Sequence, residues 1–136
     1  MKLSFLVAAL TFFGAVHAQE QTVPNAKVKN INQVDIDFSE VIDSGKITVV
    51  SFWATWCGPC IKELRAIDEY YEIWQEDYNM KFVAVSIDDA RNVKKVKPFV
   101  LGEGWTYDII LDQNQELARK MNVNNPPMTF VIDGSG

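Results

Sequence analysis

Short apolar runs alternate with stretches in which apolar residues recur every three or four positions. Two runs rich in β-branched and aromatic residues, 47–53 and 81–87, contain little polarity, which is typical of strands buried on both faces of a sheet. Between them, apolar residues follow a helical spacing from about Cys57 to Asp77, with polar residues on the remaining surface. The pattern therefore predicts a strand, a long amphipathic helix and a second buried strand.

The flanking elements are predicted from weaker signals. We expect a short strand over 27–32, a helical turn over 38–43, strands over 107–111 and 128–132, and helices over 90–100 and 113–121. Pro98 is expected near the C-terminal end of helix 90–100, and Gly102 and Gly104 are expected to break that helix. This order predicts an α/β domain with helices on both faces of the sheet.

The first residues predict a secretory signal peptide spanning 1–18. Lys2 precedes a nearly continuous apolar run, 3–15, and small residues flank His17 at the expected cleavage position after Ala18. A membrane anchor is disfavoured, because such a run spans only about 20 Å as a helix and a bilayer core measures about 30 Å. We expect export to the periplasm or another extracytoplasmic space, and a mature domain over 19–136 with no membrane span and no histidine.

The composition restricts the domain class and the binding partners but does not identify a function. The chain has 136 residues, of which 48% are hydrophobic and 23% charged, as in a single globular domain. Its formal charge of −5 argues against nucleic-acid binding, which requires clustered lysine and arginine.

The candidate chemistry lies in the only two cysteines, Cys57 and Cys60, which are separated by Gly58 and Pro59. Strand 47–53 ends just before them and the long helix begins there, so Cys57 is expected at a helix N-terminus. Unpaired backbone amides and the helix dipole stabilise a thiolate at that position, and the thiolate is the species that attacks disulfides. We therefore assign Cys57 as the nucleophile and Cys60, nearly one turn further on and less exposed, as the resolving cysteine. Gly58 allows a close turn, and Pro59 suits the first helical turn.

Two other uses of the cysteine pair are disfavoured. Zinc would need further ligands, and the mature chain offers neither a second pair nor a histidine. A structural disulfide of this separation would close a loop too short to constrain much of the unfolded chain. Asp88 and Asp89, which follow strand 81–87, are expected to cap the next helix rather than to bind a metal.

The segment Ser51-Phe52-Trp53-Ala54-Thr55-Trp56-Cys57-Gly58-Pro59-Cys60 closely resembles the active-site segment of thioredoxins. Its Ala-Thr-Trp-Cys form is similar to the exported branch typified by TlpA and ResA, and so is the segment from Val123 to Gly134. Together these similarities run from about Val23 to Gly136. The resemblance implies a thioredoxin-like fold with a central mixed sheet, and a cis peptide bond before Pro127 that faces the cysteines.

The resemblance also implies roles for other residues. Glu63 matches a glutamate near the redox pair and is the only local acid–base candidate, because Ser51 stands where thioredoxins keep a buried aspartate. Trp56 is expected to border the substrate groove together with Pro126 and Pro127. Pro126 lacks the N–H that the preceding residue usually donates to a substrate.

Two departures from the family are evident. Arg65 replaces a common helix-kinking proline, which predicts a straighter helix. The family continues with an antiparallel strand and a helix beyond Gly136, so strand 128–132 is expected to keep an unpaired edge, and we expect the sequence to be incomplete at its C-terminus.

These observations predict an exported thiol–disulfide oxidoreductase that reduces disulfides of exported proteins, apocytochrome c among them, with electrons from a membrane thiol reductant and with no cofactor or metal. One rival is a thiol peroxidase of peroxiredoxin type, which needs a threonine three or four residues before a lone cysteine and a distant arginine. Thr55 lies only two residues before Cys57. Another rival is a binding module that keeps the fold without turnover.

Overall fold

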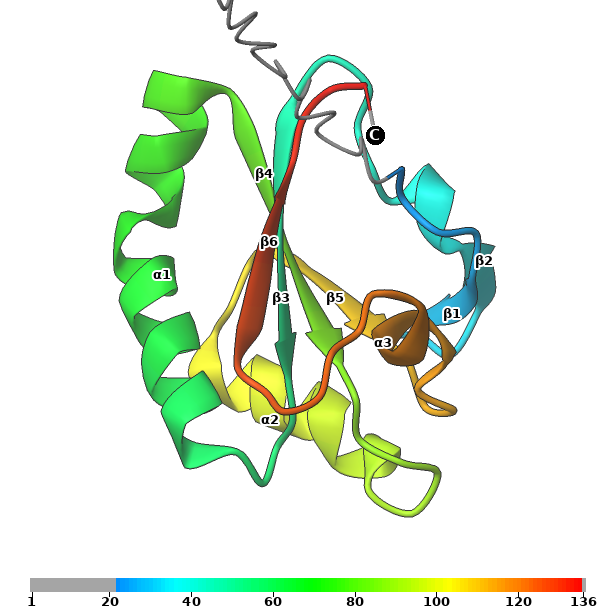
Figure 1. The fold of residues 1–136 in the computed structure, drawn as a ribbon. Helices are drawn as coiled ribbons and strands as arrows, with labels where there is room; N and C mark the ends of the chain where they lie inside the picture. The colour runs from blue at the N-terminus through cyan, green and yellow to red at the C-terminus, as the bar shows by residue number, and fades with distance from the viewer. Residues whose placement is uncertain (1–21, 136) are drawn as a thin grey trace, which may run out of the picture.

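Six strands form one mixed sheet in the computed structural model, which describes residues 22–135 (Figure 1). The strands are β1 (Lys27–Asn30), β2 (Asp35–Asp37), β3 (Ile47–Trp53), β4 (Met80–Ser86), β5 (Asp108–Leu111) and β6 (Met128–Ile132), in the spatial order β2-β1-β5-β4-β3-β6. The predicted signal peptide, with His17, lies outside the described residues.

The two strands predicted as buried lie side by side at the centre of the sheet. β3 runs parallel to β4, and β4 runs parallel to β5, whereas β6 pairs antiparallel with β3, and β1 antiparallel with both β5 and β2. Residues 82–86 of β4 and 50–53 of β3 are all buried. Parallel strands carry helices on their faces, which explains why these two runs are apolar without alternation.

Within residues 22–135, three α-helices cover the sheet: α1 (Gly58–Tyr78), α2 (Val96–Glu103) and α3 (Glu116–Lys120). Ser51 reaches Glu63 on α1, and Trp53 packs against Phe99 on α2 with ring centroids 5.9 Å apart. Alternate residues of a strand point to the same face, so α1 and α2 share one face of the sheet. Figure 1 shows α3 on the side opposite α1, as the α/β prediction requires.

Aromatic rings fill the layer between the sheet and these two helices. Trp53 contacts Trp105 edge-on at 5.4 Å between ring centroids, and Trp105 stacks on Tyr107 at 5.5 Å. Tyr107 in turn packs against Phe82 of β4 at 4.9 Å. Burial of large rings is a major source of core stability, so this cluster fixes the end of β3 from which the cysteine segment departs.

The region predicted as a helix over 90–100 is different in the structure. A 3-10 turn (Val93–Lys95) precedes α2, and α2 continues through Gly102 to Glu103. Pro98 therefore lies in the first turn of α2, where its missing N–H leaves no hydrogen bond unmade. Only Gly104 ends the helix, as a C-cap with a φ of 76°.

Other differences concern short elements. The turn predicted over 38–43 is a 3-10 helix over Phe38–Glu40, and the helix predicted over 113–121 shortens to α3. The sequence analysis missed β2, whose acidic residues are atypical of strands. Lys27 and Lys29 of β1 form ion pairs with Asp37 and Asp35 across this hairpin, at 2.8 and 2.7 Å. These cross-strand ion pairs thus accompany the pairing of β1 with β2, which no apolar pattern in the sequence indicates.

The outer edge of the sheet is as expected at β6. Among residues 22–135, β6 pairs with β3 alone, and Val131 is 72% exposed. Helix α1 runs without interruption past Arg65, which forms a two-bond ion pair with Glu103 at the end of α2. No helix in the described part of the chain is both long and apolar enough to cross a membrane.

Candidate active site

The cysteine pair lies at the junction of β3 and α1. Cys57 is the N-cap of α1, with Gly58 and Pro59 as the first two helical residues, and its sulfur accepts a hydrogen bond from the Cys60 amide at 3.3 Å. The two cysteines form a disulfide with a Cα–Cα distance of 5.3 Å. Cys57 is 6% exposed and Cys60 only 1%, so the predicted difference in accessibility is confirmed.

This placement favours one sulfur as the nucleophile. After reduction, a thiolate at Cys57 would face the unpaired amides of the first turn of α1 and the positive end of the helix dipole. Cys60 lies inside the helix and is shielded from solvent, which makes it the harder sulfur for a large substrate to reach. The geometry can therefore support attack by Cys57 followed by resolution by Cys60.

Glu63 occupies the next turn of α1 and is held by the sheet. Its Oε1 atom accepts a hydrogen bond from Ser51 Oγ of β3 at 3.2 Å and another from Thr129 Oγ1 of β6 at 3.0 Å. The two hydroxyl oxygens lie 3.1 Å apart, because Ser51 and Thr129 are register partners on adjacent strands. A partly buried carboxylate is thus fixed one turn beyond Cys60. The sequence analysis identified Glu63 and Ser51 but missed Thr129, because the β3–β6 register was not known.

The proline segment lies across from the end of β3. Phe52 pairs with Met128, so Pro127 comes next to Trp53 in the register. The peptide bond between Pro126 and Pro127 is cis, as the resemblance implied. Figure 1 shows the loop before β6 passing the end of β3 that leads into α1. Trp56, beside the cysteines in sequence, is 61% exposed, whereas Trp53 is fully buried.

Asp88 is the residue whose place the sequence analysis assigned wrongly. Neither Asp88 nor Asp89 is the N-cap of the 3-10 turn or of α2; Asp89 accepts amide hydrogen bonds from Arg91 and Asn92 in the turn that precedes both. Asp88 instead is fully buried and accepts from Thr55 of the cysteine segment. Thr55 and Asp88 follow neighbouring parallel strands at their C-terminal ends, and this strand order was the signal that could have placed them together.

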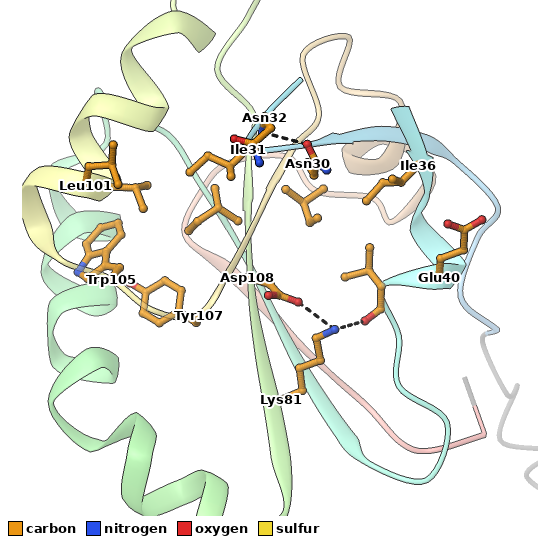
Figure 2. A pocket seen from close by; sticks show the side chains of 14 residues that line it. Asn30, Ile31, Asn32, Ile36, Glu40, Lys81, Leu101, Trp105, Tyr107 and Asp108 are labelled. Carbon is orange, nitrogen blue, oxygen red and sulfur yellow. Dashed lines mark hydrogen bonds and ion pairs between the residues drawn. The ribbon is translucent and has the colours of Figure 1, made fainter. Parts of the chain in front are cut away.

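A cavity of about 520 Å³ lies elsewhere, beside β1, β5 and α2 (Figure 2). Trp105 and Tyr107 form part of its apolar wall. Lys81 projects into it and bonds the Val41 carbonyl at 2.8 Å and the Asp108 carboxylate at 2.9 Å. Neither cysteine lines this cavity, so its volume does not contribute to the redox site. Within residues 22–135 no group of three or more histidine, cysteine or acidic side chains is arranged to hold a metal.

Comparison with known proteins places this site in a family. The model of the AhpC/TSA family matches residues 20–136. The chain belongs to the AhpC/TSA family. Among curated relatives, it is 27% identical over 126 residues to sporulation thiol-disulfide oxidoreductase A of Bacillus subtilis, covering 92% of this chain and 76% of that protein. It is 32% identical over 92 residues to thiol-disulfide oxidoreductase ResA of Geobacillus kaustophilus, covering 68% of this chain and 51% of that protein.

Solved structures show the same fold. An uncharacterized thioredoxin-like protein from Porphyromonas gingivalis superposes with a TM-score of 0.74 at 41% identity, covering 84% of this chain and 74% of that one. The structure of StoA from B. subtilis gives a TM-score of 0.67 at 28% identity, covering 85% and 84%. The predicted thioredoxin-like fold, the resemblance to the ResA branch and the thiol–disulfide oxidoreductase class are thereby confirmed.

Proposed function

We propose that this chain is an exported thiol–disulfide oxidoreductase that reduces disulfides of exported proteins through Cys57 and Cys60. The observation that carries the proposal is the Cys57–Cys60 disulfide at the N-terminus of α1, with the more exposed cysteine at the N-cap. A pair in bonding reach can take two electrons from a donor and pass them to a substrate. Thiol–disulfide exchange needs no organic cofactor or metal.

In the reductive direction, the Cys57 thiolate attacks one sulfur of the substrate disulfide and expels the other as a thiolate. The resulting mixed disulfide joins Cys57 to the substrate. Cys60 then loses its proton and attacks the Cys57 sulfur, which releases the second substrate thiolate and leaves the Cys57–Cys60 disulfide. Two electrons have moved from the protein to the substrate, and a membrane thiol reductant is the proposed source that restores the dithiol.

Glu63 is proposed to take the proton from Cys60 during resolution and return it to the departing thiolate. Its fixed position one turn beyond Cys60, on the hydroxyls of Ser51 and Thr129, supports this role. Trp56, Gly58, Pro59, Pro126 and Pro127 are proposed to form the surface that receives an extended substrate. Pro126 has no amide hydrogen, so Pro127 would contact substrate without the usual hydrogen bond from its neighbour.

Export rests on the predicted signal peptide over 1–18, with residues 19–136 as the mature domain. The periplasm or another extracytoplasmic space is therefore the proposed location, and apocytochrome c is one candidate substrate implied by the resemblance. The name sporulation thiol-disulfide oxidoreductase A shows that a relative of this type serves a different process, so the substrate is best tested directly.

A peroxidase of peroxiredoxin type is less well supported. The Thr55 hydroxyl and amide both bond Asp88, so neither is available to a peroxide. The chain has three arginines. Arg65 bonds Glu103, Arg91 bonds Asp89, and Arg119 bonds the Asn114 carbonyl, all outside the cysteine segment.

Insulin reduction tests the proposal and separates it from a non-catalytic binding module. Chain precipitation driven by dithiothreitol should accelerate with the mature protein and stay at the uncatalysed rate with Cys57→Ser. No acceleration by the wild type would support the binding module instead.

A reduction potential measured against glutathione should fall below about −200 mV, whereas a value near about −120 mV would indicate an oxidant.

A further inference from the structure

A buried carboxylate joins the cysteine segment to the neighbouring strand. Asp88 follows β4 and is 0% exposed. Its Oδ2 atom accepts from the Thr55 amide at 2.9 Å, and its Oδ1 atom accepts from the Thr55 hydroxyl at 2.7 Å. Both ends of the carboxylate thus hold one residue of the turn that leads from β3 to Cys57.

Asp88 is itself held in place by its own strand. Ser86 Oγ donates a hydrogen bond to Asp88 Oδ2 at 2.8 Å and accepts one from the Asp88 backbone amide at 3.1 Å. Ile87, the residue between Ser86 and Asp88, donates its amide to the Trp53 carbonyl at 2.8 Å. The clamp is therefore anchored on rigid elements at both sides, and each of these buried polar groups has a partner.

The clamped turn sets the position of the nucleophile. Thr55 lies two residues before Cys57, and the Cys57 amide donates to the Ala54 carbonyl at 3.0 Å. Two residues of chain span at most about 7 Å, so movement at Thr55 is transmitted to Cys57. The benefit of a helix N-terminus to a thiolate falls off within the first turn, which makes it sensitive to such a displacement.

We propose that Asp88 is a positioning residue for the redox reaction: through Thr55 it holds Cys57 at the N-terminus of α1. Asp88 does not touch the sulfurs and exchanges no proton in this scheme. The inference deepens the proposed function, since it concerns the same nucleophile.

Substitutions at Asp88 and Thr55 can separate the effect of the hydrogen bonds that position Cys57 from the effect of the Asp88 charge. Asp88→Ala removes both bonds to Thr55. Asp88→Asn can keep them, because its amide oxygen can accept from the Thr55 N–H and its NH₂ group can donate to the Thr55 hydroxyl, which is able to accept. Thr55→Val is the second variant; it keeps the shape and the backbone bond and removes only the hydroxyl bond.

The matched control is Asp112→Ala. Asp112 is also a buried carboxylate, 1% exposed, that follows a neighbouring strand, but it accepts from the amides of Leu117 and Ala118 in α3. The Asp112→Ala substitution should lower the unfolding midpoint without changing the alkylation profile of the cysteines or their rate of reaction with a disulfide. Any effect that Asp88→Ala shares with this control reflects stability alone.

The experiment follows the pH profile of Cys57 alkylation in the reduced proteins, and the rate of their reaction with a small aromatic disulfide. Asp88→Ala should slow the disulfide reaction at pH 7 by at least about fivefold and move the alkylation profile to higher pH, with Thr55→Val intermediate. The rate for Asp88→Asn should stay within about threefold of the wild-type rate.

The proposal is overturned if Asp88→Ala and Thr55→Val change only the unfolding midpoint, or if Asp88→Asn is as impaired as Asp88→Ala. Alkylation needs no protein substrate, so this arm stands even if insulin is not reduced.

Discussion

Replacing Glu63 with glutamine should slow the resolution step and leave the fold intact. The amide oxygen of the introduced side chain can accept the same two hydrogen bonds, from Ser51 and Thr129, that Glu63 Oε1 accepts now. The side chain keeps its size and its partners but loses its negative charge and, with it, the ability to take a proton. The change therefore isolates proton transfer from packing.

The size of the effect follows from the burial of Cys60, which is 1% exposed. A free thiol with a pKa of about 8.5 is about 3% ionised at pH 7, and burial in apolar surroundings raises the pKa of a thiol further. Without a nearby proton acceptor, attack depends on this small ionised fraction. Resolution should slow by about 30-fold at pH 7, just below the usual range for general-base catalysis.

The assay measures resolution alone. The mixed disulfide between Cys57 and a chromogenic aromatic thiol is formed at low pH, the pH is raised, and release of the thiol by Cys60 is followed by stopped-flow absorbance. For Glu63→Gln the rate should rise about tenfold per pH unit, because each unit raises the thiolate fraction tenfold. The wild-type profile should be flatter around neutrality.

Glu69→Gln is the control, because Glu69 is exposed and lies further along α1. It should release the thiol at the wild-type rate. Equal rates and equal pH profiles for Glu63→Gln and the wild type would show that Glu63 is a structural partner of the two hydroxyls and not a proton carrier.

Three other substitutions test the packing and electrostatics. Trp56→Ala should lower kcat/KM for insulin severalfold with an unchanged urea midpoint, since Trp56 is 61% exposed; equal loss on a small disulfide would contradict a substrate-surface role. Leu64→Ala should cost about 2–5 kcal/mol of unfolding free energy, because Leu64 is 1% exposed, and a cost below about 1 kcal/mol would argue against a packed interface. Burial raises the pKa of Asp112 above 3.8, so its contribution to stability is complete at lower pH and is lost as the pH rises. The stability advantage of the wild type over Asp112→Asn should accordingly shrink as the pH rises from 4, and an advantage that grows would refute the assignment.

The centre of the fold was predictable because its signals are local. Residues 47–53 match β3 at both ends, and 128–132 match β6, since short, mostly apolar runs rich in β-branched and aromatic residues are typical of strands. The position of Cys57 at the start of α1 followed from the same strand-to-helix transition. Pro59, the second residue of α1, is a further local signal for the first helical turn.

The remaining features depend on contacts between distant residues. Thr129 joins Glu63 through the β3–β6 register, and Asp88 joins Thr55 across 33 positions, neither of which a local pattern encodes. Likewise, β2 is accompanied by ion pairs with β1 that no local pattern encodes, and α2 is preceded by a 3-10 turn. The cis bond at Pro127 was anticipated only through the family resemblance, because X–Pro bonds are mostly trans.

The acidity of Cys57 is the most direct measure of whether the helix terminus activates this protein. Reduced mature protein is alkylated with iodoacetamide over a pH series, and modification of the Cys57 peptide is quantified by mass spectrometry. We expect a midpoint near pH 7, at least one unit below the value of about 8.5 for a free thiol. A midpoint at or above that value would contradict the mechanism, because Cys57 would then gain nothing from its place at the N-cap of α1.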